Sequence, residues 1–216
     1  MLPLKDNLGT DRLPVVTLLL IVANVAVYLL IQGGGIAHGP SEVETVGYAS
    51  AVPSLFLHAG LLHLLANMLA LWLFGPAVED SMSRWRYLLL YLAGGLAAIA
   101  LQVALDPHAT VPALGASGAV AAVLGGCLLL YPRVRFVSIV FVPLFSTLVE
   151  LPAWVPVAAW VAVQAIVGAT ALSDVADASG AVAAVAPVGG LLVGLLAVKL
   201  LADRRKQVPV RVKVAA

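Results

Sequence analysis

The sequence contains little charge and almost no cysteine. Only 11% of its 216 residues are charged, 62% are hydrophobic, and the mean hydropathy is +1.06. This composition lies far outside that of soluble globular domains and predicts a membrane protein. The single cysteine, Cys127, excludes an intramolecular disulfide. A net charge of +1 gives no reason to expect nucleic acid as a partner.

Histidine is also scarce, and it is absent from the second half of the chain. The four histidines are His38, His58, His63 and His108. Their distribution matters because Gly115-Ala116-Ser117-Gly118 places a nucleophile-type serine at the mouth of an apolar stretch. A serine nucleophile needs a base to take its proton. No imidazole after Ser117 can supply that base.

Six apolar stretches are present, and several of them approach or exceed the roughly 18–20 residues that cross a bilayer. Inside lipid each backbone polar group must be satisfied within its own segment, so these stretches must be helices. The sequence therefore predicts an all-α polytopic membrane protein, a six-transmembrane-helix bundle. Residues 14–203 would form the membrane domain, between a cytoplasmic segment 1–13 and a basic tail 204–216. The predicted spans are 14–32, 58–76, 87–105, 117–131, 152–170 and 181–201.

The charges lie on opposite sides of these six spans according to sign. With the N-terminus inside, all 12 basic residues fall on the inner side, and the charged residues of the outer loops are all acidic. The apolar segment Val134 to Val149 could pass for a seventh span, but it would move the basic tail outside. It is also short, β-branched and interrupted by Pro143. We interpret it as a re-entrant or interfacial piece on the inner side.

Small residues recur at four-residue spacing in two of the spans. Ser117, Ala121 and Gly125 follow this pattern in the fourth span, as do Ala186, Gly190 and Gly194 in the sixth. Such spacing lets helix backbones approach closely in lipid. One interpretation is generic helix packing. The other is that the fourth and sixth helices touch near Ser117, so that a residue near position 187 faces the serine.

The second span contains polar residues, which are costly in a membrane and therefore candidates for function. His63 and Asn67 lie about 40° apart on a helix and share a face, whereas His58 would point elsewhere, about 140° from His63. That divergence, and the absence of an H-E-x-x-H pattern, argue against a metal site. His63 and Asn67 could stabilise an oxyanion, or they could simply bridge helices by hydrogen bonds. Glu79 and Asp80 are expected to form a solvated helix cap.

Considered together, these motifs resemble the rhomboid family of intramembrane serine proteases over nearly the whole chain. In order along the chain, the matching segments are Met1-Leu2-Pro3-Leu4-Lys5-Asp6, Phe56-Leu57-His58-Ala59-Gly60-Leu61-Leu62-His63-Leu64-Leu65-Ala66-Asn67-Met68, Leu71-Trp72-Leu73-Phe74-Gly75-Pro76-Ala77-Val78-Glu79-Asp80, Leu114-Gly115-Ala116-Ser117-Gly118-Ala119 and Leu151-Pro152-Ala153-Trp154.

The resemblance implies a role for each matching residue. Ser117 matches the nucleophile of the family. Its own N–H, with His63 and Asn67, matches the oxyanion-binding group. His58 matches a histidine that supports the loop and cavity above the site, and Gly115 matches a glycine that leaves room beside the serine. The resemblance implies no cofactor and no metal.

One catalytic position departs from the family. The family's base is a histidine in an A-H-x-G-G motif on the sixth span, where this chain has Ala186-Pro187-Val188-Gly189-Gly190. Proline has no side-chain proton acceptor, and losing such a base costs on the order of 10⁴–10⁶ in rate. Proline also removes the helical donor for the Ala183 carbonyl, so the sixth helix should bend or start late near Ala186.

Three functions are compatible with these observations. The favoured one is a rhomboid-like pseudoprotease that binds transmembrane segments in the bilayer without cutting them. The alternative is an active serine endopeptidase that uses Ser117 and a substitute base. An unrelated six-span transporter would need ionisable residues along several spans, and here they are almost confined to the second. The expected location is the bacterial plasma membrane, with both termini in the cytoplasm.

The charge distribution predicts the topology directly. A reporter fused after residue 205 should report a cytoplasmic location, and one inserted within residues 33–50 should report an extracytoplasmic location. Only this topology places all the basic residues inside. An extracytoplasmic C-terminus would contradict the six-span count.

Overall fold

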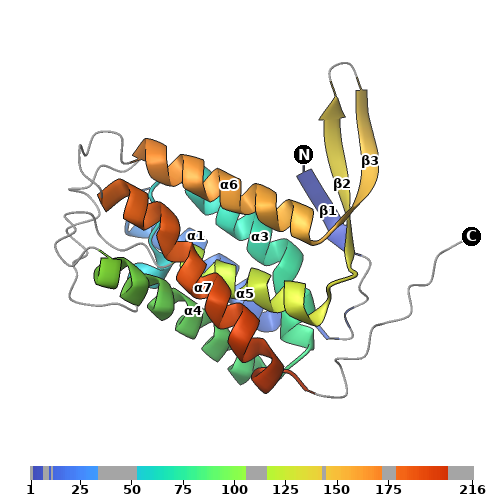
Figure 1. The fold of residues 1–216 in the computed structure, drawn as a ribbon, viewed down its shortest axis with the longest axis horizontal. Helices are drawn as coiled ribbons and strands as arrows, with labels where there is room; N and C mark the ends of the chain where they lie inside the picture. Colours follow the sequence, from blue (N-terminus) through green and yellow to red (C-terminus); the bar gives the residue numbers. More distant parts are fainter. Residues whose placement is uncertain are drawn as a thin grey trace, which may run out of the picture.

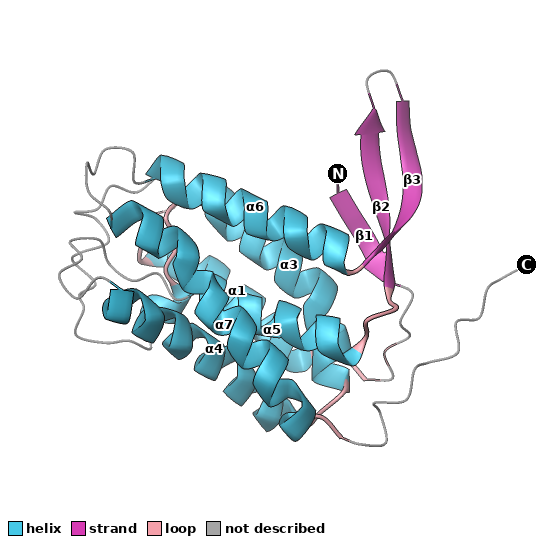
Figure 2. Ribbon diagram, viewed as in Figure 1, coloured by secondary structure: helices cyan, strands magenta, loops and turns pink. Residues whose placement is uncertain are grey.

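The computed structural model of the protein describes residues 2–6, 10, 12–33, 53–105, 116–142, 145–171 and 179–203. Within these residues six long helices form one bundle, with a small sheet at one end (Figures 1 and 2). Their bounds match the six predicted spans within a few residues. The largest difference is in the second helix, which ends at Asp80 and not at residue 76. The helices are α1 (Val15–Leu30), α3 (Leu61–Asp80), α4 (Arg84–Leu105), α5 (Ala116–Leu130), α6 (Trp154–Ala171) and α7 (Ser179–Leu201).

The outer surface of the bundle is apolar, as expected for helices that face lipid. Large hydrophobic side chains such as Leu30, Leu62 and Leu200 are more than half exposed. Among the described residues, α3 and α4 are long and apolar enough to cross a membrane by length and composition. The described apolar stretches of the other four helices are shorter than these two.

Helix α5 occupies the centre of the bundle, and every residue from Ala116 to Cys127 is buried. It packs against α3, α4 and α7. Glycine makes these contacts possible because it has no side chain to separate the backbones. A β-carbon at Gly190 of α7 would overlap the carbonyl oxygen of Gly118, and one at Gly194 would overlap that of Ala122. The predicted contact between the fourth and sixth spans is therefore confirmed.

The structure also shows how α7 accommodates Pro187. The helix runs from Ser179 to Leu201 with Pro187 inside it, so the late start near Ala186 that we considered is wrong. Proline removes one backbone donor, but membrane helices tolerate this where neighbouring helices support them. Here Gly189 and Gly190 hold the next turn against the backbones of α4 and α5.

A three-stranded antiparallel sheet lies at the end of the bundle that contains the chain's N-terminus and the C-terminal end of α7 (Figure 1). It consists of β1 (Leu2–Asp6), β2 (Arg135–Val142) and β3 (Phe145–Pro152) in the order β1-β2-β3. The segment from Val134 to Val149 is thus no seventh helix. It forms most of a hairpin, a strand structure that our prediction did not contain and that suits its β-branched composition. Phe136 fixes the hairpin to the bundle, with its ring 4.6 Å from that of Phe74.

Glu79 ties α3 to the first turn of α1 at the same end. Its carboxylate accepts hydrogen bonds from the backbone N–H groups of Val16 (3.0 Å) and Thr17 (2.8 Å) and from the Thr17 hydroxyl (2.8 Å). Glu79 is only 4% exposed, so the expected solvated cap is wrong for this residue. It is instead a buried cap of another helix, which satisfies donors that Pro14 at the N-cap cannot reach.

A second polar contact fixes the C-terminal end of α7. The guanidinium of Arg86 on α4 donates to the Leu201 carbonyl (3.3 Å) and pairs with Asp203 (3.0 Å). The Asp203 N–H donates to the Ser81 carbonyl (2.9 Å). A cation at a helix C-terminus is favourable because the last carbonyls there lack helical donors.

The glycine contacts predict a strong effect of one methyl group. Gly190→Ala should lower the free energy of unfolding in detergent by at least about 2 kcal/mol, because the added carbon meets backbone that cannot rotate away. Leu192→Ala, a control on the half-exposed face of the same helix, should change it by less than about 1 kcal/mol. Equal effects of the two variants would contradict the close helix contact.

The buried cap predicts a graded series at position 79. Glu79→Ala should cost about 2–4 kcal/mol of unfolding free energy, because it leaves buried donors of α1 unpaired. Glu79→Gln keeps one acceptor oxygen and should fall between Ala and wild type. A Gln variant as unstable as the Ala variant would show that the contact depends on charge and not on acceptor geometry.

Candidate active site

Ser117 lies in the first turn of α5 and is 6% exposed. The first backbone N–H groups of a helix have no helical acceptor, so this turn presents donors and the positive end of the helix dipole. At 15 residues α5 is about 22 Å long, shorter than the roughly 30 Å hydrocarbon core of a bilayer. With its C-terminal end at one membrane surface, α5 would place Ser117 below the opposite surface.

His63 and Asn67 lie one turn apart near the start of α3, which packs directly against α5. His63 is 8% exposed and Asn67 is fully buried. Both side chains are therefore buried in the bundle, on a helix that packs directly against the serine helix. Hydrogen-bond or one-water reach between these side chains and Ser117 stays a prediction.

The hydrogen bonds of His63 define which of its nitrogens holds the proton. Its Nδ1 accepts from the backbone N–H of Ala59 (3.2 Å), so in the neutral ring the proton lies on Nε2. His63 can therefore donate a hydrogen bond from Nε2, but this nitrogen cannot accept a proton in that form. This arrangement suits an oxyanion donor better than a base.

His58 does not lie on the helix, and its side chain does not point away from His63. It precedes α3, and its ring lies edge-on to that of His63 at a centroid distance of 5.4 Å. Our expectation of diverging rings is wrong because it assumed a helix from residue 58, three residues before α3 begins. No third metal-binding side chain joins the two imidazoles within the described ranges.

Gln32, at the end of α1, holds the backbone of His58. Its side-chain amide donates to the His58 carbonyl (2.7 Å) and accepts from the His58 N–H (3.0 Å). The ring Nδ1 of His58 lies 3.1 Å from the Phe56 carbonyl, which can only accept, so Nδ1 is the donor. The remaining nitrogen, Nε2, is buried without a partner among the described groups.

The structure adds Gln164 of α6, which the sequence analysis missed. Its Nε2 donates to Oδ1 of Asn67 at 2.8 Å, and both side chains are buried. An isolated amide in an apolar span is the sequence signal that could have identified it, because such a group must find a partner in lipid.

Pro187 is half-buried on α7, one turn before Gly190. The contacts from Gly190 to Gly118 and from Gly194 to Ala122 run in the same direction along both helices. Pro187 lies on the turn of α7 that precedes the contact between Gly190 and Gly118. Gly115, the remaining candidate, lies outside the described residues.

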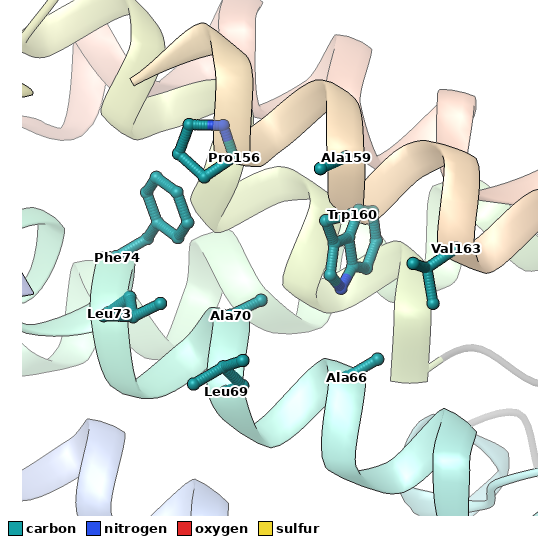
Figure 3. Close-up of a pocket in the computed structure, with 9 residues that line it drawn as sticks. All are labelled: Ala66, Leu69, Ala70, Leu73, Phe74, Pro156, Ala159, Trp160 and Val163. Atoms are coloured by element: carbon teal, nitrogen blue, oxygen red, sulfur yellow. The ribbon is translucent and has the colours of Figure 1, made fainter. Parts of the chain in front are cut away.

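An apolar cleft of about 130 Å³ lies between α3 and α6 (Figure 3). The Asn67–Gln164 hydrogen bond joins the same two helices. Its walls include Ala66, Ala70 and Phe74 on α3 and Pro156, Trp160 and Val163 on α6. The indole of Trp160 turns toward α3 in Figure 3, and its N–H is buried without a partner among the described groups.

Relatives with curated names are similar over part of their length. The chain is 32% identical to rhomboid protease GluP of Bacillus subtilis over 53% of this chain and 24% of the relative. It is 30% identical to the human mitochondrial presenilin-associated rhomboid-like protein over 59% of this chain and 35% of the relative. It is 32% identical to mitochondrial rhomboid protein 1 of Saccharomyces cerevisiae over 68% and 40%. The chain thus spans less than half the length of these relatives.

No solved structure matches the chain significantly. The family comparison is more extensive, since the Rhomboid domain matches residues 45–204. That range holds Ser117, His63, Asn67 and Pro187, and it covers five of the six helices. The chain is therefore a member of the rhomboid family, a family of multi-pass integral membrane proteins.

Proposed function

We propose that this protein binds transmembrane helices and has lost the peptidase chemistry of its family at Pro187. The observation that carries the proposal is the backbone contact between Gly118 and Gly190, which sets the first turn of α5 against α7. A base on α7 one turn before Gly190 would reach toward Ser117. Pro187 occupies that position and has no proton acceptor, so the serine stays a neutral hydroxyl and a poor nucleophile.

The alternative is an active endopeptidase with a substitute base, and one observation favours it. Nε2 of His58 is an imidazole nitrogen with a free lone pair, close to His63. His63 is the weaker candidate, because its Nδ1 already accepts from Ala59 and its Nε2 then holds the proton. Of the two histidines within the described residues, His58 is therefore the better candidate for the base of an active enzyme.

The proposed ligand is a transmembrane segment of another membrane protein. The cleft between α3 and α6 is lined by apolar side chains and could take one apolar side chain of such a segment. Its position beside Asn67 and Gln164 would bring the bound segment to the polar groups of the site. The active alternative would use the same cleft but cut the segment at Ser117.

We further propose that the protein resides in a bacterial plasma membrane with both termini in the cytoplasm. The bundle comprises residues 14–203, with the segment 1–13 and the basic tail 204–216 on the inner side. The bacterial relative GluP and the basic residues at one end of the bundle support this orientation. In Figure 1 the N-terminus, the hairpin and the C-terminal end of α7 all lie at that end.

Restoring the missing imidazole should restore chemistry. The wild-type protein should not label at Ser117 with a fluorophosphonate, whereas Pro187→His should label at least about 100-fold faster, the lower range for a positioned general base. The same variant should cut a model transmembrane substrate. Mass spectrometry of the labelled peptide and a gel assay of cleavage measure the two outcomes.

Ser117→Ala in the Pro187→His background is the matched control and should abolish both signals. Robust cleavage by the wild-type chain that Ser117→Ala removes would overturn the pseudoprotease proposal, and His58→Ala would then test the substitute base. No gain from Pro187→His would mean that the site has changed beyond one side chain.

A further inference from the structure

Strand β3 has one edge without a partner strand among the described residues. The order of the sheet is β1-β2-β3, and all eight residues of β3 pair with β2 in an unbroken antiparallel register. The other edge of β3 therefore presents a row of backbone N–H and C=O groups. The only proline of the strand is Pro152, at its last position, so no proline blocks this edge. Such an edge is a template for a further strand.

The opposite edge of the sheet is less suited to a further strand. Strand β1 has only five residues and contains Pro3, and its register with β2 shifts between Pro3 and Lys5. Short edge strands, proline and bulges are the features by which proteins discourage strand addition. Of the two edges of this sheet, that of β3 is therefore the more open to a partner.

The basic tail contains a segment with the pattern of a strand. Valine occupies every second position from Val208 to Val214, and the residues between are Pro209, Arg211 and Lys213. Regular alternation of β-branched and polar residues predicts a half-buried strand. Proline near the start of a strand is compatible with an edge position. The tail lies outside the described residues, so this strand is a prediction from the sequence.

A short series of contacts connects the start of the tail to the base of the hairpin. The Asp203 N–H donates to the carbonyl of Ser81 (2.9 Å), which lies one helical turn after Ala77. The Ala77 carbonyl accepts from the hydroxyl of Tyr131 (3.3 Å) at the end of α5. The Tyr131 carbonyl in turn accepts from the N–H of Val134 (3.1 Å), directly before β2. One turn of α3 and one tyrosine side chain thus separate the tail from the hairpin.

The tail is long enough to reach β3, and it leaves the bundle in a suitable direction. Ten residues lead from Asp203 to Lys213, and an extended chain of that length spans up to about 35 Å. Strand β2 runs away from the bundle and β3 returns to it (Figure 1). A strand that starts at the bundle and runs outward beside β3 would therefore be antiparallel to it, as its neighbours in the sheet are.

The two faces of the sheet match the two faces of the predicted strand. Phe136 is buried and pairs with Leu151 of β3, so their face of the sheet is turned toward the bundle. Glu150 is exposed, and as the adjacent residue in β3 it lies on the other face. In an added strand the valines can share the face of Leu151 while Arg211 and Lys213 share that of Glu150. Opposite charges on neighbouring strands are favourable.

We propose that residues 208–214 of the tail bind to the free edge of β3 as a fourth, antiparallel strand, with Arg211 and Lys213 on the face of Glu150. The bound tail covers the edge that would otherwise be open to a second copy of the protein. It also connects the end of α7 to the hairpin. This inference concerns the end of the molecule that holds the sheet and does not depend on the helix-binding function.

Cysteine cross-linking of the whole chain in vesicles tests both the pairing and the face. In a Cys127→Ala background, Glu150→Cys is combined with Arg211→Cys or Lys213→Cys on the same face, or with Val212→Cys as the control on the other face. Residues opposite each other on one face are close enough for a disulfide, so oxidation with copper phenanthroline should join at least one same-face pair about tenfold faster than the control.

The distribution of the cross-links identifies the occupant of the edge. Equal rates in all three pairs, or no cross-link within one chain, would overturn the proposal. Same-face cross-links that occur only between two chains, at twice the mass on a non-reducing gel, would also overturn it. A second copy of the protein would then be the partner of β3.

Hydrogen exchange followed by NMR tests the backbone pairing without cysteines. Every second amide of β3 points to the free edge, and these amides should exchange about tenfold faster in a chain that ends at residue 205 than in the wild type. Val212→Pro should have the same effect because it removes a donor from the middle of the added strand. Ala216→Pro, beyond the valine pattern, is the matched control and should change nothing, and the amides that face β2 should stay protected throughout. Unchanged exchange at the free edge after truncation would contradict the proposal.

Discussion

The close approach of α5 and α7 is the constraint on which the rest of the structure depends. A β-carbon at Gly190 of α7 would overlap the backbone of Gly118 on α5, and one at Gly194 would overlap that of Ala122. In lipid no hydrophobic force drives helices together, so packing of this kind has to provide the attraction. It also fixes the register of the two helices around Gly118 and Gly190. The proposed loss of the base at Pro187 depends on this register.

Polar contacts hold the two ends of the bundle in different ways. At the end that holds the sheet, Glu79 caps α1, Arg86 holds the end of α7, and the sheet joins the N-terminus to the hairpin. At the other end Gln32 fixes the segment that contains His58. Helix α6 packs on α7 and more sparsely on α3, where the apolar cleft opens beside the Asn67–Gln164 bond. The polar contacts thus lie at the two ends of the bundle and between α3 and α6, whereas glycine packing holds its centre.

The sequence was a good guide wherever one physical rule dominated. Hydrophobic length located all six helices, and the four-residue spacing of small residues located the contact between α5 and α7. It failed where the answer depended on tertiary partners. Glu79 looked like a solvated cap because the helix end it serves, α1, lies 62 residues away in sequence. His58 was expected to point away from His63 because it was placed on a helix that begins only at Leu61. The role of Gln164 could not be assigned without knowing that α6 lies beside Asn67.

The central claim is that the base is the main group missing from this site, and chemical rescue tests this claim most directly. Pro187→Gly removes the ring and leaves space for a free imidazole beside Ser117. Fluorophosphonate labelling of Ser117 is then measured in this variant and in the wild type as imidazole is added. The account predicts labelling that rises with imidazole in Pro187→Gly and stays at background in the wild type. Labelling of the wild-type protein well above background without imidazole, or no rise with imidazole in Pro187→Gly, would contradict it.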